Sequence, residues 1–244
     1  MNPKSEESRS VLECAQEALR RADPEAVAAR SGAELEGRDG EAVFVLRLLD
    51  QTLHMTHPRL QVTRADGKPC PAWQTHLLTY YLSLADGTQP AGTWVALRDL
   101  ADGMFYQRAY QGYSGDELVR RFGNDLEPLR KACRALAGEA LNTGDAGYRF
   151  RVLPRVWLAV VYWLGEDAIP PSARVLFDAA IRHYLPTDTC AALGGWLAGR
   201  IVKQWAIDQR LGDLPKAGEP SPVDEPHQGQ GHSHPEAGKP SGDG

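Results

Sequence analysis

The chain has few of the features that indicate a particular chemistry. Its four cysteines are far apart, and no two of them form a CxxC pair; they are Cys14, Cys70, Cys133 and Cys190. Zinc ribbons and ferredoxin-type clusters both need closely spaced cysteines, so this spacing excludes them. No segment matches GxGxxG or GxxxxGK[ST], which argues against a nucleotide hydrolase with a phosphate loop.

Two further absences concern membranes and charge. There is no run of about eighteen apolar residues, and the polar start MNPKSEESRSV contains no apolar signal segment. We therefore expect a cytoplasmic protein with reduced thiols. Residues 212–244 hold six acidic residues and two lysines, a charge of −4, which leaves −1 of the total of −5 for the rest. A nearly neutral folded part predicts no nucleic-acid partner.

Composition divides the chain at about residue 212. Residues 212–244 are rich in glycine and proline and poor in apolar residues, so burial cannot offset the entropy of ordering them. We expect a disordered acidic tail over residues 212–244. Residues 1–211 are expected to form a single globular domain, which is long enough to bury a core without disulfides.

The remaining pattern predicts the fold class. Helical and extended stretches are interleaved without a regular βαβ repeat, and the strands come in local pairs, which favours antiparallel pairing. The run VWLAVVYWL at residues 156–164 is the expected central strand. We predict an α+β fold with a mainly antiparallel sheet covered by helices. Helices are expected over residues 5–29, 24–30, 73–84, 116–122, 124–137 and 187–210, and strands over 41–49, 52–57, 60–63, 93–97, 139–142, 148–153, 156–164 and 175–177.

Three segments carry a resemblance to a known family. They are GTWVALRDLADGMFY (92–106), RRFG (120–123), and residues 153–188, which end in IPPSARVLFDAAIRHYLPTD. In this order they resemble the domain of unknown function 3786 family, uncharacterised proteins of anaerobic bacteria and archaea, over residues 11–200. The family brings no established activity. Some relatives carry a cysteine-rich iron–sulfur segment similar to that of corrinoid iron–sulfur proteins, which this chain lacks. The resemblance implies a setting near redox cofactors or one-carbon metabolism.

The end of the third segment places an imidazole, a phenol and carboxylates close together in sequence. An imidazole near a carboxylate can act as a general base, a metal ligand or an axial ligand to a tetrapyrrole, so His183 with Asp178 or Asp188 is the candidate catalytic set. The structural alternative is that Thr187 or Asp188 caps the last helix and His183 only bonds the backbone. Asp178 and His183 converge only if the chain turns after Asp178.

A second candidate region combines aromatic and basic side chains. Tyr106, Tyr110 and Tyr113 have the spacing of one helix face, and Arg98 and Arg108 are near in sequence. Aromatic rings with arginine can hold a planar anionic ligand by stacking and charge-assisted hydrogen bonds. The alternative is a helix face that packs into the core. The predicted ligand-binding residues are Arg98, Tyr106, Tyr110, His183 and Tyr184.

The other histidines and cysteines are weaker candidates. His54 and His57 would point to opposite faces of a strand and could not chelate one ion. Cys70 is interpreted as a loop cysteine, since no neighbouring residue supplies a base. His232 and His234 in the tail could bind nickel or zinc weakly.

Two classes of function remain open. The first is a non-catalytic ligand- or cofactor-binding accessory protein of anaerobic redox or one-carbon metabolism, with a tetrapyrrole or a metal as cofactor and a metalloenzyme as partner. The second is a hydrolase- or lyase-type enzyme that uses His183 as general acid/base with a nearby carboxylate. A structural interaction module is a third alternative. No membrane partner is expected.

Overall fold

The computed structural model describes residues 3–38 and 40–212, and every strand pair in these ranges is antiparallel. The strands form two sheets, with the orders β1-β2-β3-β4 and β5-β9-β8-β7-β6. The predicted single-domain α+β fold with antiparallel strands is therefore confirmed, although it contains two sheets where one was expected. The tail predicted at 212–244, with His232 and His234, lies outside the described residues from residue 213 on.

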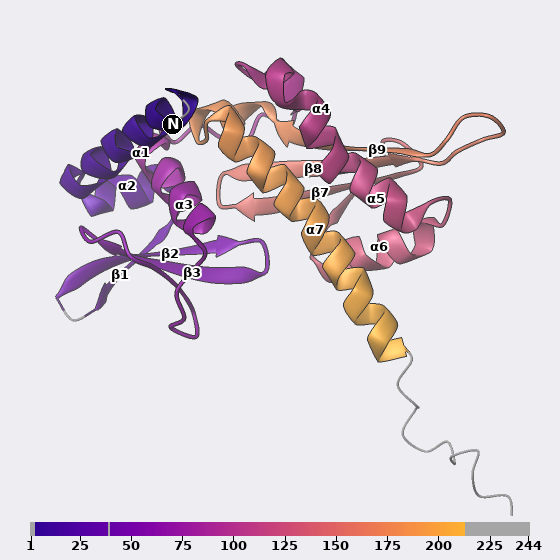
Figure 1. The fold of residues 1–244 in the computed structure, drawn as a ribbon. Coiled ribbons are helices and arrows are strands. Elements are labelled where there is room, and N and C mark those ends of the chain that lie inside the picture. The colour runs from indigo at the N-terminus through magenta and orange to yellow at the C-terminus, as the bar shows by residue number, and fades with distance from the viewer. Residues whose placement is uncertain (1–2, 39, 213–244) are drawn as a thin grey trace, which may run out of the picture.

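The first sheet is a meander of strands that follow one another along the chain (Figure 1). Its strands are β1 (Glu34–Arg38), β2 (Glu41–Leu48), β3 (Gln51–His57) and β4 (Val62–Arg64), and the helices before and after it are α1 (Pro3–Arg21), α2 (Pro24–Ser31) and α3 (Ala72–Leu84). Apolar residues alternate along β2 and β3, so the Phe44–Met55 and Leu46–Leu53 pairs place all four side chains on one buried face.

The second sheet carries the predicted central strand in its middle. Its strands are β5 (Trp94–Val95), β6 (Glu139–Leu141), β7 (Ala146–Leu153), β8 (Val156–Trp163) and β9 (Ser172–Asp178). Its helices are α4 (Gly103–Tyr113), α5 (Gly115–Phe122), α6 (Leu126–Ala135) and α7 (Thr187–Gly212). Figure 1 shows α7 crossing one face of this sheet, with α5 and α6 on the same side. None of the described helices has the length and apolarity needed to cross a bilayer.

Buried contacts join the two sheets. The backbone N–H of Leu49, just after β2, donates to Val152 O of β7 at 2.8 Å. The hydroxyl of Tyr81 on α3 donates to Ser31 O and accepts from Arg155 N, which ties α2 and α3 to the start of β8. One buried apolar cluster contains residues from both sheets, so the core is continuous.

Some local predictions were wrong in detail. The sequence pattern did not indicate β1, because its residues ELEGR are all exposed and show no apolar alternation. The strand expected over 93–97 ends at Val95, and a short 3-10 helix, η1 (Leu97–Asp99), follows it. Asp125 caps α6 in place of the expected Asn124. Asp23 does cap α2 as predicted, and Gly32 ends that helix with a φ of 72°.

Candidate functional site

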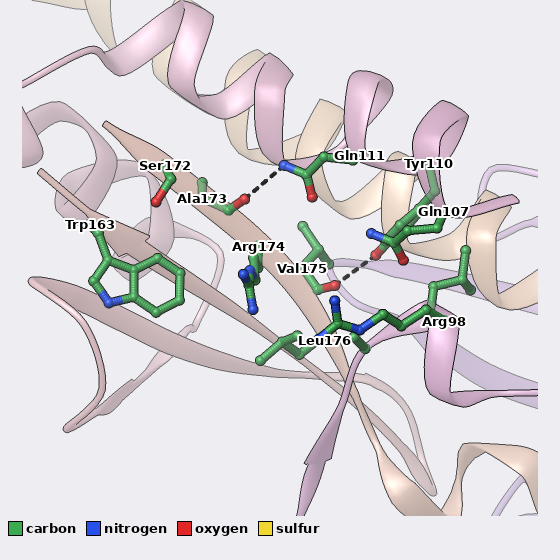
Figure 2. Close-up of a pocket in the computed structure, with 12 residues that line it drawn as sticks. Arg98, Gln107, Tyr110, Gln111, Trp163, Ser172, Ala173, Arg174, Val175 and Leu176 are labelled. Carbon is green, nitrogen blue, oxygen red and sulfur yellow. Dashed lines mark hydrogen bonds between the residues drawn. The ribbon is translucent and has the colours of Figure 1, made fainter. Parts of the chain in front are cut away.

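A cleft of about 500 Å³ opens beside the outer edge of β9, beyond the end of β5. β5 pairs with β9 only at Phe177 and Asp178, so on this side the preceding part of β9 has no neighbouring strand, while β8 pairs with it on the other side. Helix α4 and the turn after β5 form the other walls (Figure 2). We call this the edge cleft, and its main polar and aromatic side chains are Arg98, Gln107, Tyr110, Gln111, Trp163 and Arg174.

Two side chains of α4 donate hydrogen bonds to backbone carbonyl groups on this edge of β9. Tyr110 Oη donates to Val175 O at 2.9 Å, and Gln111 Nε2 donates to Ala173 O at 3.0 Å (Figure 2). The N–H and C=O of one residue in an antiparallel strand point to the same side, so the N–H groups of Ala173 and Val175 also leave the sheet here. Outside the strand ladders, no backbone hydrogen bond from either N–H is found within residues 3–38 and 40–212. The edge therefore offers two hydrogen-bond donors.

Positive charge and an aromatic ring complete the edge cleft. Arg98 comes from the turn after β5 and Arg174 from β9, and both side chains are exposed. The Arg174 guanidinium carbon lies 5.8 Å from the centroid of the Trp163 ring, while Arg98 approaches Asp99 at 3.7 Å. Gln107 Oε1 is buried without a hydrogen-bond partner in the described part of the chain. Since buried polar atoms are normally paired, Gln107 is a position where a ligand donor would fit.

Tyr110 forms part of the wall of the cleft, and its phenol is a weaker acid than that of an exposed tyrosine. Its side chain is 2% exposed, and burial raises its pKa well above the ordinary value. Gly194 of α7 makes room for the ring, because a Cβ there would lie 2.4 Å from the Tyr110 hydroxyl oxygen. Tyr106 and Tyr113 are 38% and 46% exposed, so the predicted three-tyrosine face is not the buried face. The buried face of α4 is centred on Gly103 and Tyr110, and Tyr106 and Tyr113 lie at its border.

The residues around Asp178 form a different arrangement, which we call the loop clamp because it holds residues 85–93. Asp178 Oδ1 accepts from Ala91 N at 2.8 Å and Ala180 N at 2.9 Å, and Oδ2 accepts from Gly92 N at 2.7 Å. The Asp178 side chain is buried, and both of its oxygens are engaged by backbone groups. Asp178 therefore has a structural role, because its hydrogen bonds hold the loop between α3 and β5 in place.

His183 and Tyr184 hold the same loop from the 3-10 helix η2 (Ala179–His183) and its end. His183 Nδ1 lies 2.7 Å from Asp86 Oδ2, and Tyr184 Oη donates to Thr88 O. Hydrogen bonds from Thr88, followed by that from His183, lower the pKa of Asp86 to about 2. The buried Tyr184 ring stacks on Tyr81 with the centroids 5.5 Å apart. Asp86 is 97 residues before His183, so no local sequence pattern predicted this partner.

The structure thus separates the predicted site residues into two groups. The edge cleft contains Arg98 and Tyr110, whereas neither His183 nor Tyr184 lines it. The two carboxylates predicted to act with His183 have other partners. Asp178 is engaged by the loop backbone, and Asp188 accepts from Thr189 N in the first turn of α7.

Thiols and metal ligands do not gather in the described residues. Burial raises the pKa values of the Cys133 and Cys190 thiols far above the ordinary value and, to a smaller extent, that of Cys70. No group of three His, Cys, Asp or Glu side chains is placed to hold a metal ion within residues 3–38 and 40–212. His57 Nε2 lies 3.0 Å from Leu19 O, which is a structural contact between β3 and α1.

Comparison with known proteins assigns this domain to a family. The model of a family described as a domain of unknown function (DUF3786) matches residues 23–200. The chain belongs to this family. The resemblance seen in the sequence is confirmed, and the matched range contains both the edge cleft and the loop clamp. No curated protein and no solved structure matches the chain.

The side chains that line the edge cleft limit which cofactor this DUF3786 domain could hold there. The lining contains no histidine, cysteine or methionine, and the Tyr110 hydroxyl is already bonded to Val175 O, so no side chain is left as an axial ligand for the metal of a tetrapyrrole. Arg98 and Arg174 could still pair with the carboxylates of a planar macrocycle, and Trp163 could contact its ring. The lining therefore fits an organic anion better than a metal-ligating cofactor.

Sequence reasoning missed half of the edge cleft. Gln107 and Gln111 are four residues apart on α4, and this spacing beside Tyr110 was an available signal for one polar helix face. Arg174 alternates with the buried Ala173 and Val175 on β9, which predicts that it points away from the core. The pairing of β5 with β9 brings Arg98 close to Arg174 and to the two glutamines. Local sequence patterns do not specify this pairing.

Proposed function

We propose that this DUF3786 protein is a non-catalytic binding protein whose edge cleft holds an organic anion with a planar group. The observation that carries the proposal is that two arginines and two backbone N–H donors line the same cleft. Donors without matching acceptors favour a negatively charged ligand, and Trp163 offers a planar surface beside Arg174.

The lining favours binding over catalysis. It contains no carboxylate, imidazole or thiol, and burial keeps the Tyr110 phenol protonated at neutral pH. General acid/base catalysis needs a group that changes protonation near the working pH, and the edge cleft has none. As the wider setting we propose an accessory role in anaerobic redox or one-carbon metabolism in the cytoplasm, on the strength of the family resemblance alone.

The enzyme alternative rests on the contact between His183 and Asp86. An imidazole held 2.7 Å from a carboxylate is the arrangement of an oriented general base. The two side chains are 40% and 49% exposed and lie outside the edge cleft, so a substrate would have little to bind to beside them. For this reason the binding protein is the stronger proposal.

The binding proposal can be tested with small anions. We expect phthalate to raise the melting temperature and to give a saturable calorimetric titration, while the neutral phthalamide has no effect. Arg98→Ala and Arg174→Ala should each weaken phthalate binding about tenfold, because each removes charge-assisted hydrogen bonds. Tyr106→Phe, outside the cleft, is the control. Unchanged affinity in both arginine variants would show that the edge cleft is not the site.

The cofactor version has a separate test. Protein purified under anaerobic conditions is examined by its absorbance spectrum and by metal analysis. A visible absorption band that Arg98→Ala and Arg174→Ala both weaken supports a tetrapyrrole held through its carboxylates. A colourless and metal-free protein eliminates the tetrapyrrole and metal versions but not the binding of a colourless anion.

A further inference from the structure

A second cleft, of about 730 Å³, lies where the two sheets meet. We call it the junction cleft, and its polar and aromatic lining consists of Glu34, Arg47, Thr52, Glu139, Arg151 and Trp157. Arg151 donates from Nε and Nη2 to Pro154 O at 3.1 and 2.9 Å, which fixes its guanidinium group. Arg47 takes part in none of the ion pairs of the described residues. The junction cleft thus repeats the two arginines and one tryptophan of the edge cleft.

The two clefts lie at the two ends of one sheet face. Trp157 and Trp163 are six residues apart on β8 and therefore point to the same side of the second sheet, roughly 20 Å apart at 3.3 Å per residue. Tyr162 alternates with them on β8 and donates to Gly123 O at the end of α5, so the helices α5 to α7, which Figure 1 shows together on one side of this sheet, lie on the side away from the tryptophans. We call the side with the tryptophans the open face. Between the two tryptophans lie the small side chains of Ala159 and Val161, which are 0% and 1% exposed.

Arginine side chains lie beside both rings on the open face. The Arg149 guanidinium carbon is 5.1 Å from the Trp157 ring centroid, just as Arg174 approaches Trp163. Five arginines follow the line from the edge cleft to the junction cleft: Arg98, Arg174, Arg149, Arg151 and Arg47. The acids along it are Asp99, Glu34 and Glu139, and Glu139 is bonded to Arg149 at 2.6 Å. The face is locally positive although the whole chain is negative.

From this repeat we infer that the open face binds single-stranded nucleic acid, with one strand running from the edge cleft to the junction cleft. The inference rests on the proposed function, because the edge cleft is the same anion site. A polynucleotide carries a phosphate and a planar base in each repeating unit. On the open face, the arginines could pair with the phosphates and the tryptophans could stack on the bases. Bases stack on tryptophan only when they are unpaired, which favours a single strand over a duplex. The net charge of −5 predicts no nucleic-acid partner, but it is a sum over the whole chain and does not show the local excess of arginines on the open face.

The test uses the full chain and dye-labelled oligonucleotides. We expect fluorescence anisotropy to report binding of oligo-dT and oligo-U of about twelve nucleotides, within the site sizes of known single-strand binders. A duplex of equal length and thymidine monophosphate should bind at least about tenfold more weakly. Affinity should fall with salt at a slope of about −3 on logarithmic axes, as expected for about four released counterions.

Variants at the two clefts separate this inference from the binding proposal. Trp157→Ala and Arg151→Ala in the junction cleft, and Arg174→Ala in the edge cleft, should each weaken oligonucleotide binding about tenfold. Arg20→Ala on α1 removes an arginine outside the open face and should bind as the unchanged chain does. Trp157→Phe keeps a ring, and it replaces the alanine variant if that variant fails to fold.

Four outcomes would overturn the inference. If Arg174→Ala weakens oligonucleotide binding but the junction-cleft variants do not, the site is the edge cleft alone and only the anion proposal survives. If phthalate binds and no oligonucleotide does, the same conclusion holds. If poly-glutamate binds as tightly as the oligonucleotide, the face is a site for acidic peptides. Loss of both phthalate and oligonucleotide binding refutes both proposals together.

Discussion

The loop clamp and the edge cleft use similar residue types in opposite ways. In the loop clamp, Asp178 and Tyr184 direct their polar atoms to backbone groups of residues 85–93, and His183 pairs with Asp86. In the edge cleft, Gln107 Oε1 has no hydrogen-bond partner in the described part of the chain, and the N–H groups of Ala173 and Val175 point out of the sheet. A polar group with partners inside the protein stabilises the fold, whereas one left without a partner in a cleft is free for a ligand.

Asp178→Ala should have the largest effect on stability and would test the loop clamp most severely. It leaves three backbone N–H groups without their acceptor, two of them from the loop before β5. We expect the free energy of unfolding to fall by about 3 kcal/mol, measured by urea denaturation. Asp188→Asn, at an exposed carboxylate, should change it by less than about 0.5 kcal/mol. Equal effects of the two variants would contradict the structural role of Asp178.

Gly115→Ala tests how closely α5 packs against the edge of β9. A Cβ at Gly115 would lie 2.1 Å from Ala173 O and 2.4 Å from Gln111 Nε2, so the backbone or the cleft wall must move. We expect a loss of about 2 kcal/mol of stability and weaker phthalate binding. Gly112→Ala is the matched control, since its Cβ meets nothing within 4 Å. It should stabilise the helix by up to about 1 kcal/mol. If both variants behave alike, the close approach at Gly115 is wrong.

Tyr184→Phe removes one hydrogen bond of the loop clamp and keeps its buried ring. The lost donor to Thr88 O should lower the free energy of unfolding by about 1 kcal/mol, while the stack on Tyr81 remains. Tyr106→Phe, at an exposed tyrosine of α4, should be neutral in the same urea titration. Neither substitution should change phthalate affinity. Weakened binding in Tyr184→Phe would connect the loop clamp with the ligand site and remove the contrast between them.

The smallest effect concerns pH. Because the pKa of Asp86 is lowered from 3.8 to about 2 in the folded state, its ionised form favours the fold at higher pH. This contribution is complete above the ordinary pKa and is lost as the pH falls through about 2. Melting temperatures of the unchanged chain and of Asp86→Asn should therefore differ most at neutral pH and converge only as the pH falls to about 2. A constant difference over this range would contradict the assignment.

Elements that depend on local pattern could be predicted from the sequence. The apolar run 156–164 is β8 at the centre of its sheet, and Asp23 with Gly32 bounds α2, because burial periodicity and capping act over a few residues. The family was indicated by a different signal, the resemblance of segments within 92–188 to known sequences, and the family match confirms it. Exposed strands such as β1 leave no such signal, since pairing with β2 and not burial makes them extended.

The sites were less predictable because they depend on contacts between distant segments. His183 was singled out by its neighbours in sequence, but its partner Asp86 comes from the loop between α3 and β5, 97 residues earlier. Asp178 was predicted as a catalytic carboxylate, but the backbone N–H groups of residues 91 and 92 donate hydrogen bonds to it. These donors are far from Asp178 in sequence, so no local pattern indicated them. Arg98 was predicted as a ligand residue, and the edge cleft adds Arg174, which only the β5–β9 pairing brings close.

That pairing also sets an order of events during synthesis. The first sheet uses residues 34–64 in consecutive hairpins, so it can form as soon as they leave the ribosome. β5 is made soon afterwards, but its partner β9 ends only at Asp178. Until then, Trp94 and Val95 have no strand to pair with, and the loop before them lacks the carboxylate that holds it. The second half of the domain must therefore wait for its last strand before the edge cleft exists at all.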